Sequence, residues 1–296
     1  QGTAVAGSGG VTAWMASRLF GGRVRGNFLL AAGLAIVMLM LVATLLAGWL
    51  APYSPVQDCG ARLAVPTAAH WLGTDQLSRD VLSRILHGGR VPITVALLSC
   101  LISLVVGSVL GLVSGFRGGM LDRILSLIMD AIFSFPALIL AIAIVAVLGA
   151  GLANMVLAIS FVYIPTYFRV VRGQVLQIRE LEHVEAARAL GAGTLRLLFR
   201  HVAPAALPSV LALTSFNIAD GILTEAALAF LGFGLPPPTP DWGFDIQNGQ
   251  KFLQAGYWWL VTFPGLAIVF LALGFGMLGE GLNDMLSPTR QQRLAG

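Results

Sequence analysis

The sequence predicts an all-α, polytopic membrane protein with six transmembrane helices. Of its 296 residues, 57% are hydrophobic and only 11% are charged, whereas an ordinary soluble domain carries roughly a quarter charged residues. Four uncharged runs are 23 to 38 residues long, and about 20 apolar residues are enough for a helix to cross a bilayer. This composition excludes a water-soluble fold.

The first predicted span is residues 28–50, which carry no charge. Residues 51–90 are mixed in character, with several prolines and aspartates, and we expect a loop outside the membrane there. Its Asp80–Ile85 part is suited to a short helix. The loop therefore separates the first span from the five that follow.

The second predicted span, residues 91–116, contains three glycines at four-residue spacing: Gly107, Gly111 and Gly115. This spacing places three small residues on one helix face, which favours close contact with another helix. Glycines are also tolerated wherever membrane helices pack, and the sequence leaves both interpretations open.

The other four spans follow from the remaining apolar runs. Residues 131–168 would extend about 57 Å as one helix, nearly twice the hydrocarbon core, so we expect spans three and four with a break at Gly149–Gly151. Residues 169–201 carry six Arg and three Glu, which predicts a polar helical loop. Spans five and six are predicted at 208–233 and 252–279.

The distribution of basic residues predicts the orientation. One side of this layout receives 13 of the 18 Lys and Arg residues and the other side receives five. Cytoplasmic loops carry the excess of positive charge, so both termini are expected in the cytoplasm. The predicted segments are a cytoplasmic N-terminal segment (1–27), a first transmembrane helix (28–50), an extracytoplasmic loop (51–90), a core with five spans and the loop 169–201 (91–283), and a cytoplasmic tail (284–296).

The sequence contains no recognised motif for ATP hydrolysis, other catalysis or metal binding. It has no G-x-x-x-x-G-K-[ST] phosphate loop, no H-E-x-x-H and no G-x-S-x-G pattern, and its single lysine, Lys251, follows Gln250. The two cysteines, Cys59 and Cys100, are far apart in the sequence and are not at ligand spacing. The net charge of +4 is explained by topology, because no basic stripe with interleaved aromatic residues suggests nucleic acid.

One motif lies in the loop after span four. It reads Glu185-Ala186-Ala187, then Gly191 after three residues, then His201-Val202-Ala203-Pro204. A short helix with consecutive exposed alanines offers a slim surface that can enter a cleft of a partner. Gly191 can supply the left-handed turn that returns the chain to the membrane. An ordinary solvated amphipathic helix explains the same residues, since Ala, Glu, Arg and Leu are good helix formers.

This motif resembles the EAA loop of permease subunits in bacterial ABC importers. The stretch EAARALGAGTLRLLFRHVAPAALP, residues 185–208, is similar in particular to the second permease (C-type) subunit of dipeptide and oligopeptide importers. Further similar segments occur in the expected order and cover nearly the whole chain: LGTDQLSRDVLSR (72–84), ILTEAALAFLGFG (222–234), PPTPDWG (237–243) and GEGLNDMLSP (279–288).

Four positions depart from the expected pattern. Ala203 stands where the general loop pattern has Leu, and Ser78, Asn283 and Ser287 replace the Gly, Arg and Asp of the peptide group. These differences bear on the substrate more than on membership of the family.

The resemblance implies a type I ABC importer permease fold in the bacterial plasma (inner) membrane, and it implies partners. The loop with Glu185, Ala186, Ala187 and Gly191 would seat in a groove of an ATPase subunit and convert ATPase closure into helix tilting. The implied partners are a homologous second permease, two ATPase subunits, an extracytoplasmic substrate-binding protein and membrane lipid, with no nucleic acid. ATP and Mg would be bound by the ATPase subunits, so this chain would need no cofactor and would not be an enzyme.

The implied substrates are di- or oligopeptides, and nickel, glutathione or another small solute is the alternative. An ion-coupled secondary transporter is a rival from another class. It predicts inverted repeats and broken midplane helices, which the sequence does not show, and it leaves the alanine-rich loop unexplained.

Two acidic residues lie inside predicted span five. Asp220 is about 18 Å and Glu225 about 26 Å from its start at Pro208, and the two are separated by about 140° around the helix, so they are not expected to share a proton. Ionisable groups at membrane depth face a water path or a partner. One hypothesis is that both line the translocation path, with Asp220 meeting the amino end of a peptide. The other is a structural pair with the partner permease.

Overall fold

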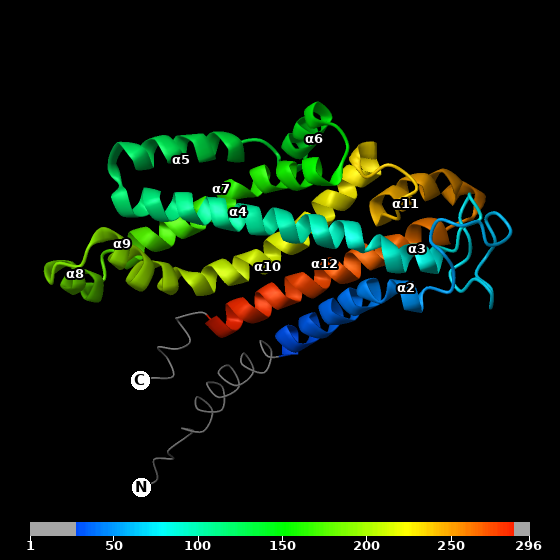
Figure 1. The fold of residues 1–296 in the computed structure, drawn as a ribbon, viewed down its shortest axis with the longest axis horizontal. Helices are drawn as coiled ribbons and strands as arrows, with labels where there is room; N and C mark the ends of the chain where they lie inside the picture. Colours follow the sequence, from blue (N-terminus) through cyan, green and yellow to red (C-terminus); the bar gives the residue numbers. More distant parts are fainter. Residues whose placement is uncertain (1–27, 287–296) are drawn as a thin grey trace, which may run out of the picture.

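The computed structural model describes residues 28–286, and the predicted segment 1–27 and the tail from 287 onward lie outside the described residues. The described part is built from helices without a β-strand (Figure 1). Five of its helices are long and apolar enough to cross a membrane, or six if one bent pair is counted as a span. The predicted all-α fold class is confirmed.

The elements follow one another in this order: a first helix Phe28–Leu45, α2 Ala47–Leu50, α3 Val81–Gly88, α4 Arg90–Arg117, α5 Gly119–Phe133, α6 Ala137–Leu148, α7 Leu152–Ile178, α8 Glu182–Ala189, α9 Thr194–Leu197, the π-helix η1 Leu198–Val202, α10 Ala203–Leu228, the π-helix η2 Ala229–Phe233, α11 Trp242–Gly249, the 3-10 helix η3 Gln250–Ala255, and α12 Trp259–Leu286.

The long helices run along the long axis of the molecule (Figure 1). The short helices α8 and α9 lie at one end of this bundle, called here the α8 end. At the other end, called the α11 end, the segment 51–80 and α3 lie beside α11 and together form what we call the cap. The core between the two ends is formed mainly by α4, α7, α10 and α12.

The three glycines of α4 pack directly against α7. A Cβ atom added at Gly107 or Gly111 would lie 2.6 or 2.7 Å from a backbone oxygen of α7, and one at Gly115 would lie 3.0 Å from another. Real Cβ atoms essentially never come closer than 3.0 Å to another atom, so Gly107 and Gly111 require glycine for the two backbones to lie at this distance, and Gly115 lies at that limit. The interpretation of these glycines as a close helix contact is confirmed.

The first helix is held against α12 in the same way. A Cβ atom at Gly33 would lie 2.7 Å from the backbone nitrogen of Leu278, and one at Gly281 would lie 2.7 Å from that of Leu30. In lipid no hydrophobic driving force holds helices together, and small residues allow the close van der Waals packing that does. The first helix is therefore packed along α12 rather than attached only through its loop.

The predicted start of span three at residue 131 is wrong, and the sequence did not predict a bend within this segment. The helix starts at Gly119 and is broken near Pro136, where α5 and α6 meet at 89°. The sequence criterion required a stretch without charge, but Asp122 and Asp130 of α5 pair with arginines of α7 and so lie within the helix. The break follows from proline, which disfavours helical backbone in the residue before it.

The predicted turn at Gly149–Gly151 is confirmed. Gly149 has φ 89° and Gly151 has φ 155°, both in the region that glycine tolerates. The side chain of Asn154 donates hydrogen bonds of 2.9 and 3.0 Å to the carbonyl oxygens of Leu148 and Gly149, which satisfies the end of α6. The turn places α6 and α7 side by side with the shortest possible connection.

Two other boundaries differ from the sequence prediction. α7 continues to Ile178, beyond the expected end at residue 168, because Arg169 and Arg172 bond carboxylates of α5. The last long helix begins at Trp259 instead of Phe252, and a 3-10 helix occupies residues 250–255. The end of α7 and the start of α12 therefore differ from the boundaries that hydropathy predicts, the first because of ion pairs and the second because of a local 3-10 helix.

Substitution of Gly111 tests the α4–α7 contact. Gly111→Ala should lower the free energy of unfolding by about 1–3 kcal/mol, because the added methyl group has no room against the backbone of α7. Gly173→Ala on α7 is the matched control, since a Cβ atom there meets nothing within 4 Å. Thermal unfolding of the two purified variants in detergent measures the difference, and equal stabilities would contradict the contact.

Candidate functional site

The helix α8 contains the motif singled out in the sequence and ends in a Schellman turn. The amide of Gly191 donates to the carbonyl of Arg188 at 3.0 Å, and the amide of Ala192 donates to that of Ala187 at 3.1 Å. Gly191 has φ 83°, as the sequence predicted. The turn stops the helix sharply and directs the chain into α9 and α10.

α8 projects from the bundle and is held by one side. Val184 is fully buried and belongs to the same hydrophobic cluster as residues at the end of α7 and in η1. Glu185 and Ala186 are exposed and Ala187 is partly buried. Leu190, just after the helix, is 89% exposed. Exposed small side chains and an exposed leucine beside charged residues, on a fixed helix, are suited to contact with another protein.

Asp220 lies on the surface of the chain near the middle of α10. Its Oδ2 accepts a hydrogen bond of 2.7 Å from the hydroxyl of Tyr163 on α7, and that hydroxyl lies 3.1 Å from Oγ1 of Thr224. The side chain is exposed, and none of the ion pairs found among the described residues includes it. A charged group in this position requires water, substrate or a partner chain beside it.

A second polar cluster lies deeper between α4, α7 and α10. The hydroxyl of Tyr167 lies 3.0 Å from Sγ of Cys100 and donates to Oγ1 of Thr214 at 3.2 Å. Tyr167 and Cys100 are buried, and the hydroxyl of Thr214 donates in turn to a carbonyl of its own helix at 2.7 Å. This cluster is saturated within the chain and joins three helices.

Glu225, unlike Asp220, is enclosed within the chain. Its side chain is 0% exposed and adjoins Asp241, which immediately precedes α11 and is also 0% exposed. The sequence correctly separated Glu225 from Asp220, but it missed Asp241 as a functional candidate, because a lone aspartate in a proline-rich loop carries no signal of its partner. Because Glu225 has no exposed surface, its side chain does not face a translocation path. Asp220 is exposed and is the one of these two residues that can line such a path.

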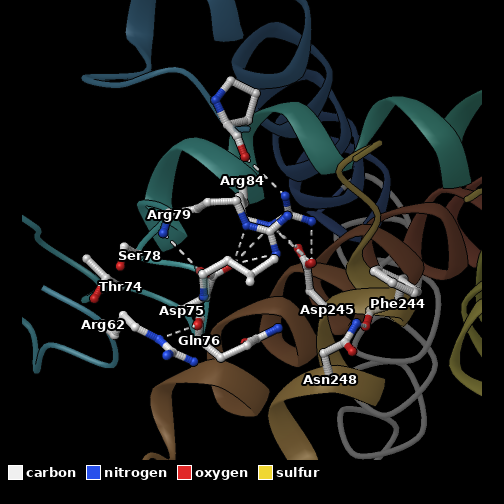
Figure 2. A network of polar contacts seen from close by, with 12 residues as sticks. Arg62, Thr74, Asp75, Gln76, Ser78, Arg79, Arg84, Phe244, Asp245 and Asn248 are labelled. Atoms are coloured by element: carbon white, nitrogen blue, oxygen red, sulfur yellow. Dashed lines mark hydrogen bonds and ion pairs between the residues drawn. The ribbon is translucent and has the colours of Figure 1, made fainter. Parts of the chain in front are cut away.

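The cap is built on Arg84, which the sequence did not single out (Figure 2). Its guanidinium is bonded to both carboxylate oxygens of Asp245 on α11, at 2.5 to 3.1 Å, and donates to the carbonyl of Pro55 at 3.0 Å. Asp75 lies 3.9 Å away and pairs with Arg79 at 2.6 Å. Arg84 is only 2% exposed. One buried cation therefore ties α3, the segment 51–80 and α11 together.

Burial raises the pKa of Asp245 to about 6, and the charge of Arg84 opposes that rise. The pKa in the folded chain thus exceeds the ordinary value of about 4. Ionisation of Asp245 opposes folding as the pH rises from about 4 to about 6, and Arg84 limits that cost.

Two ion pairs join α5 to α7 beside an open cleft of about 650 Å³. Arg172 bonds both oxygens of Asp122, at 2.5 and 2.7 Å, and Arg169 bonds Asp130 at 3.0 Å. The first pair is largely enclosed, whereas both side chains of the second are more than half exposed. These pairs explain how the α5 segment, most of which was not included in a predicted span, forms a helix that carries charged residues.

These features define a multi-pass helical membrane protein with a projecting helix at one end and an ion-paired cap at the other. The model of the family described as "Binding-protein-dependent transport system inner membrane component" matches residues 107–292. The chain belongs to this family of transport permeases.

Curated relatives match most of the chain. A dipeptide transport system permease protein, DppC of Escherichia coli K12, is 43% identical over 267 residues, with 88% of this chain and 89% of that protein covered. A glutathione transport system permease protein, GsiD of Pectobacterium atrosepticum, is 39% identical, with 90% and 88% covered. A di/tripeptide transport system permease protein of Pseudomonas aeruginosa is 39% identical, with 86% of each covered.

The fold is also found in a solved structure. A chain of the MetNI methionine ABC transporter in inward-facing conformations superposes with a TM-score of 0.55 at 19% sequence identity, covering 69% of this chain and 96% of that one. At this identity the likeness shows the fold alone, and it agrees with the type I importer permease fold implied by the sequence resemblance.

Substitution of Arg84 tests the cap. Arg84→Gln should lower the free energy of unfolding by about 3 kcal/mol at pH 7.5, because it leaves the buried Asp245 carboxylate without its cation. The loss should shrink at pH 5, where Asp245, with its pKa of about 6, is already protonated in the unsubstituted chain.

Arg62→Gln is the matched control, because Arg62 is an exposed arginine of the same segment that bonds only the carbonyl of Gln76. Thermal unfolding in detergent at the two pH values measures both variants. A loss for Arg84→Gln that is no larger than the control's, or that is the same at both pH values, would contradict the network as described.

Proposed function

We propose that this chain is a permease subunit of an ATP-driven importer for di- or oligopeptides and that α8 is its contact with an ATPase subunit. The observation that carries the proposal is the geometry of α8: a short, rigidly terminated helix whose Glu185 and Ala186 face away from the bundle. The dipeptide and di/tripeptide permeases among its relatives support the substrate class.

The proposed assembly contains a homologous second permease, two ATPase subunits and an extracytoplasmic substrate-binding protein. ATP and Mg would be bound by the ATPase subunits, and this chain would itself catalyse no reaction. The excess of Arg on one side of the layout supports a cytoplasmic α8 end, cytoplasmic termini and an extracytoplasmic cap. The many exposed large apolar side chains of the long helices suit contact with lipid and with the second permease.

Glutathione is a second candidate substrate, because a glutathione permease is similar to this chain over nearly the same length. Glutathione is itself a small peptide, so the same path chemistry serves both. Uptake of labelled dipeptide and labelled glutathione by vesicles containing the complete transporter distinguishes them. Transport driven by an ion gradient without ATP would overturn the importer proposal.

Disruption of the turn after α8 tests the coupling role. Gly191→Val should lower ATP-driven uptake about tenfold or more, because a β-branched residue does not adopt the φ of 83° found there. Gly193→Ala is the matched control, since a Cβ atom at Gly193 meets nothing within 4 Å and its φ is not positive. The measurements are uptake, ATPase activity and co-purification of ATPase subunits.

Coupling through α8 would be contradicted if Gly191→Val retained both ATPase subunits and the full rate of uptake. An equal loss in Gly193→Ala would also contradict it, because the effect would then come from any change in this loop.

Substitution of Asp220 tests its proposed place on the translocation path, where it would meet the amino end of a peptide. Asp220→Asn should reduce uptake about tenfold, the value of one lost charge-assisted hydrogen bond, without loss of the partner subunits. Asp58→Asn, an exposed carboxylate of the segment 51–80, is the control. Normal uptake by Asp220→Asn would remove Asp220 from the path, and loss of the second permease would instead assign it to the subunit interface.

A further inference from the structure

The joint between α10 and α11 encloses two carboxyl groups. Glu225 lies near the end of α10 and Asp241 lies immediately before α11, and both are 0% exposed. They come from different elements, 16 positions apart in the sequence. Two acidic side chains sealed from water in one place require compensation, because an isolated buried carboxylate is strongly unfavourable.

The hydrogen-bond donors around them do not suffice for two carboxylates. Oδ1 of Asp241 accepts from the amides of Gly243 and Phe244 at 2.8 and 3.2 Å, as the N-cap of α11. Oδ2 of Asp241 and both oxygens of Glu225 are buried and have no donor within the described structure. Three acceptors are therefore left unsatisfied if both groups are ionised.

The two groups can satisfy each other only with a proton. The two carboxyl groups act on each other electrostatically, and the neighbouring residues Ala226 and Gly243 pack against each other. Two carboxylates both accept, so a hydrogen bond between them requires a hydrogen on one of the two. Asp241 is the group expected to be ionised, because its Oδ1 already accepts hydrogen bonds from two backbone amides. Glu225 is then the neutral donor to Oδ2 of Asp241.

The surrounding charges do not replace this proton. Arg84 on α3, whose charge acts on Asp241, is engaged by Asp245 and Pro55, and Arg79 is engaged by Asp75. On α11, Asp245 adds a further negative charge beside Asp241. Burial raises the pKa of Asp241 even though Arg84 and the amides of α11 act in the opposite direction.

The joint between α10 and α11 is closely packed. A Cβ atom at Gly243 would collide with the carbonyl oxygen of Ala226, and one at Gly234 would lie 2.9 Å from Cβ of Ala229. Trp242 is buried beside it and donates from its indole nitrogen to the carbonyl of Ile85 at 2.9 Å. The backbones of α10 and of the start of α11 are thus in close contact beside the two carboxyl groups.

We propose that Glu225 and Asp241 hold a single proton between them and that this proton-bridged carboxyl pair fastens α11, and with it the cap, to α10. Loss of the proton leaves two adjacent buried anions, which repel each other and loosen the joint. The pair is thus a pH-sensitive latch between the cap and the bundle, and it does not depend on which solute the protein transports.

The sign of the pH dependence follows from proton counting. Near neutral pH the folded chain holds one proton on this pair, whereas in the unfolded chain both carboxyl groups are ionised, with ordinary pKa values of about 4. Stability therefore falls as the pH rises, by up to about tenfold in the folding equilibrium constant per pH unit while the pair keeps its proton.

The test is thermal unfolding of the full-length protein, with any subunits that co-purify, between pH 6.5 and 9. This range lies above the pKa of about 6 of Asp245, so that group contributes little to the slope. The unsubstituted protein should lose stability as the pH rises. Glu225→Gln should match it at pH 6.5 and lose much less at pH 9, because the glutamine amide donates to Asp241 at every pH.

Asp241→Asn is the second variant and should also flatten the pH dependence, because the asparagine amide donates to Glu225 while its oxygen still caps α11. Asp58→Asn, an exposed carboxylate, should keep the slope of the unsubstituted protein. Hydrogen exchange at the amides of Trp242–Gly249, corrected for intrinsic rates, should rise with pH in the unsubstituted protein and not in Glu225→Gln.

The proposal is overturned if Glu225→Gln and Asp241→Asn both retain the slope of the unsubstituted protein. It is equally overturned if both variants are unstable at every pH, since the carboxyl groups would then be needed for something other than a shared proton.

Discussion

The close contact of α4 with α7 is the constraint on which the rest of the structure depends. Three glycines one turn apart let the two backbones touch along much of their length. α3 and the cap lead directly into α4, and α7 leads directly into α8. The contact therefore joins the two ends of the molecule through one closely packed pair of helices. In the proposed importer, such a connection would link the proposed ATPase contact at the α8 end to the α11 end.

Charge inside this apolar bundle is handled by three different means. Charged residues of α5 and α7 form ion pairs with each other. Arg84 is enclosed among acceptors in the cap. Glu225 and Asp241 are proposed to share a proton. Asp220 differs from all of these, because it is exposed on the surface of the chain with a single tyrosine hydroxyl as its partner. That difference is the physical reason for assigning Asp220 to the path or to a subunit interface.

The fold class, the turn between α6 and α7 and the left-handed residue at Gly191 could be predicted, because each depends on local composition or on the unusual freedom of glycine. The close contact at the glycines of α4 was one of two interpretations that the sequence left open. The start of α5 and the continuation of α7 could not, because Asp122 and Arg172 are compatible with a buried helix only once they meet. The partner of Arg84 is Asp245 on α11, 161 residues away. The neighbour of Glu225 is Asp241, the N-cap of α11, 16 residues away. Pairings of this kind are set by the tertiary fold and leave no periodic signal in the sequence.

The proposed contact between α8 and an ATPase subunit can be tested directly. The most direct measurement is cross-linking in native membranes from a photoreactive residue at Ala186, compared with one at Val147, which is 85% exposed but lies on α6. The account predicts a cross-link to an ATPase subunit from position 186 and none from position 147. Cross-links to an ATPase from position 147 alone, or only to lipid from position 186, would contradict it.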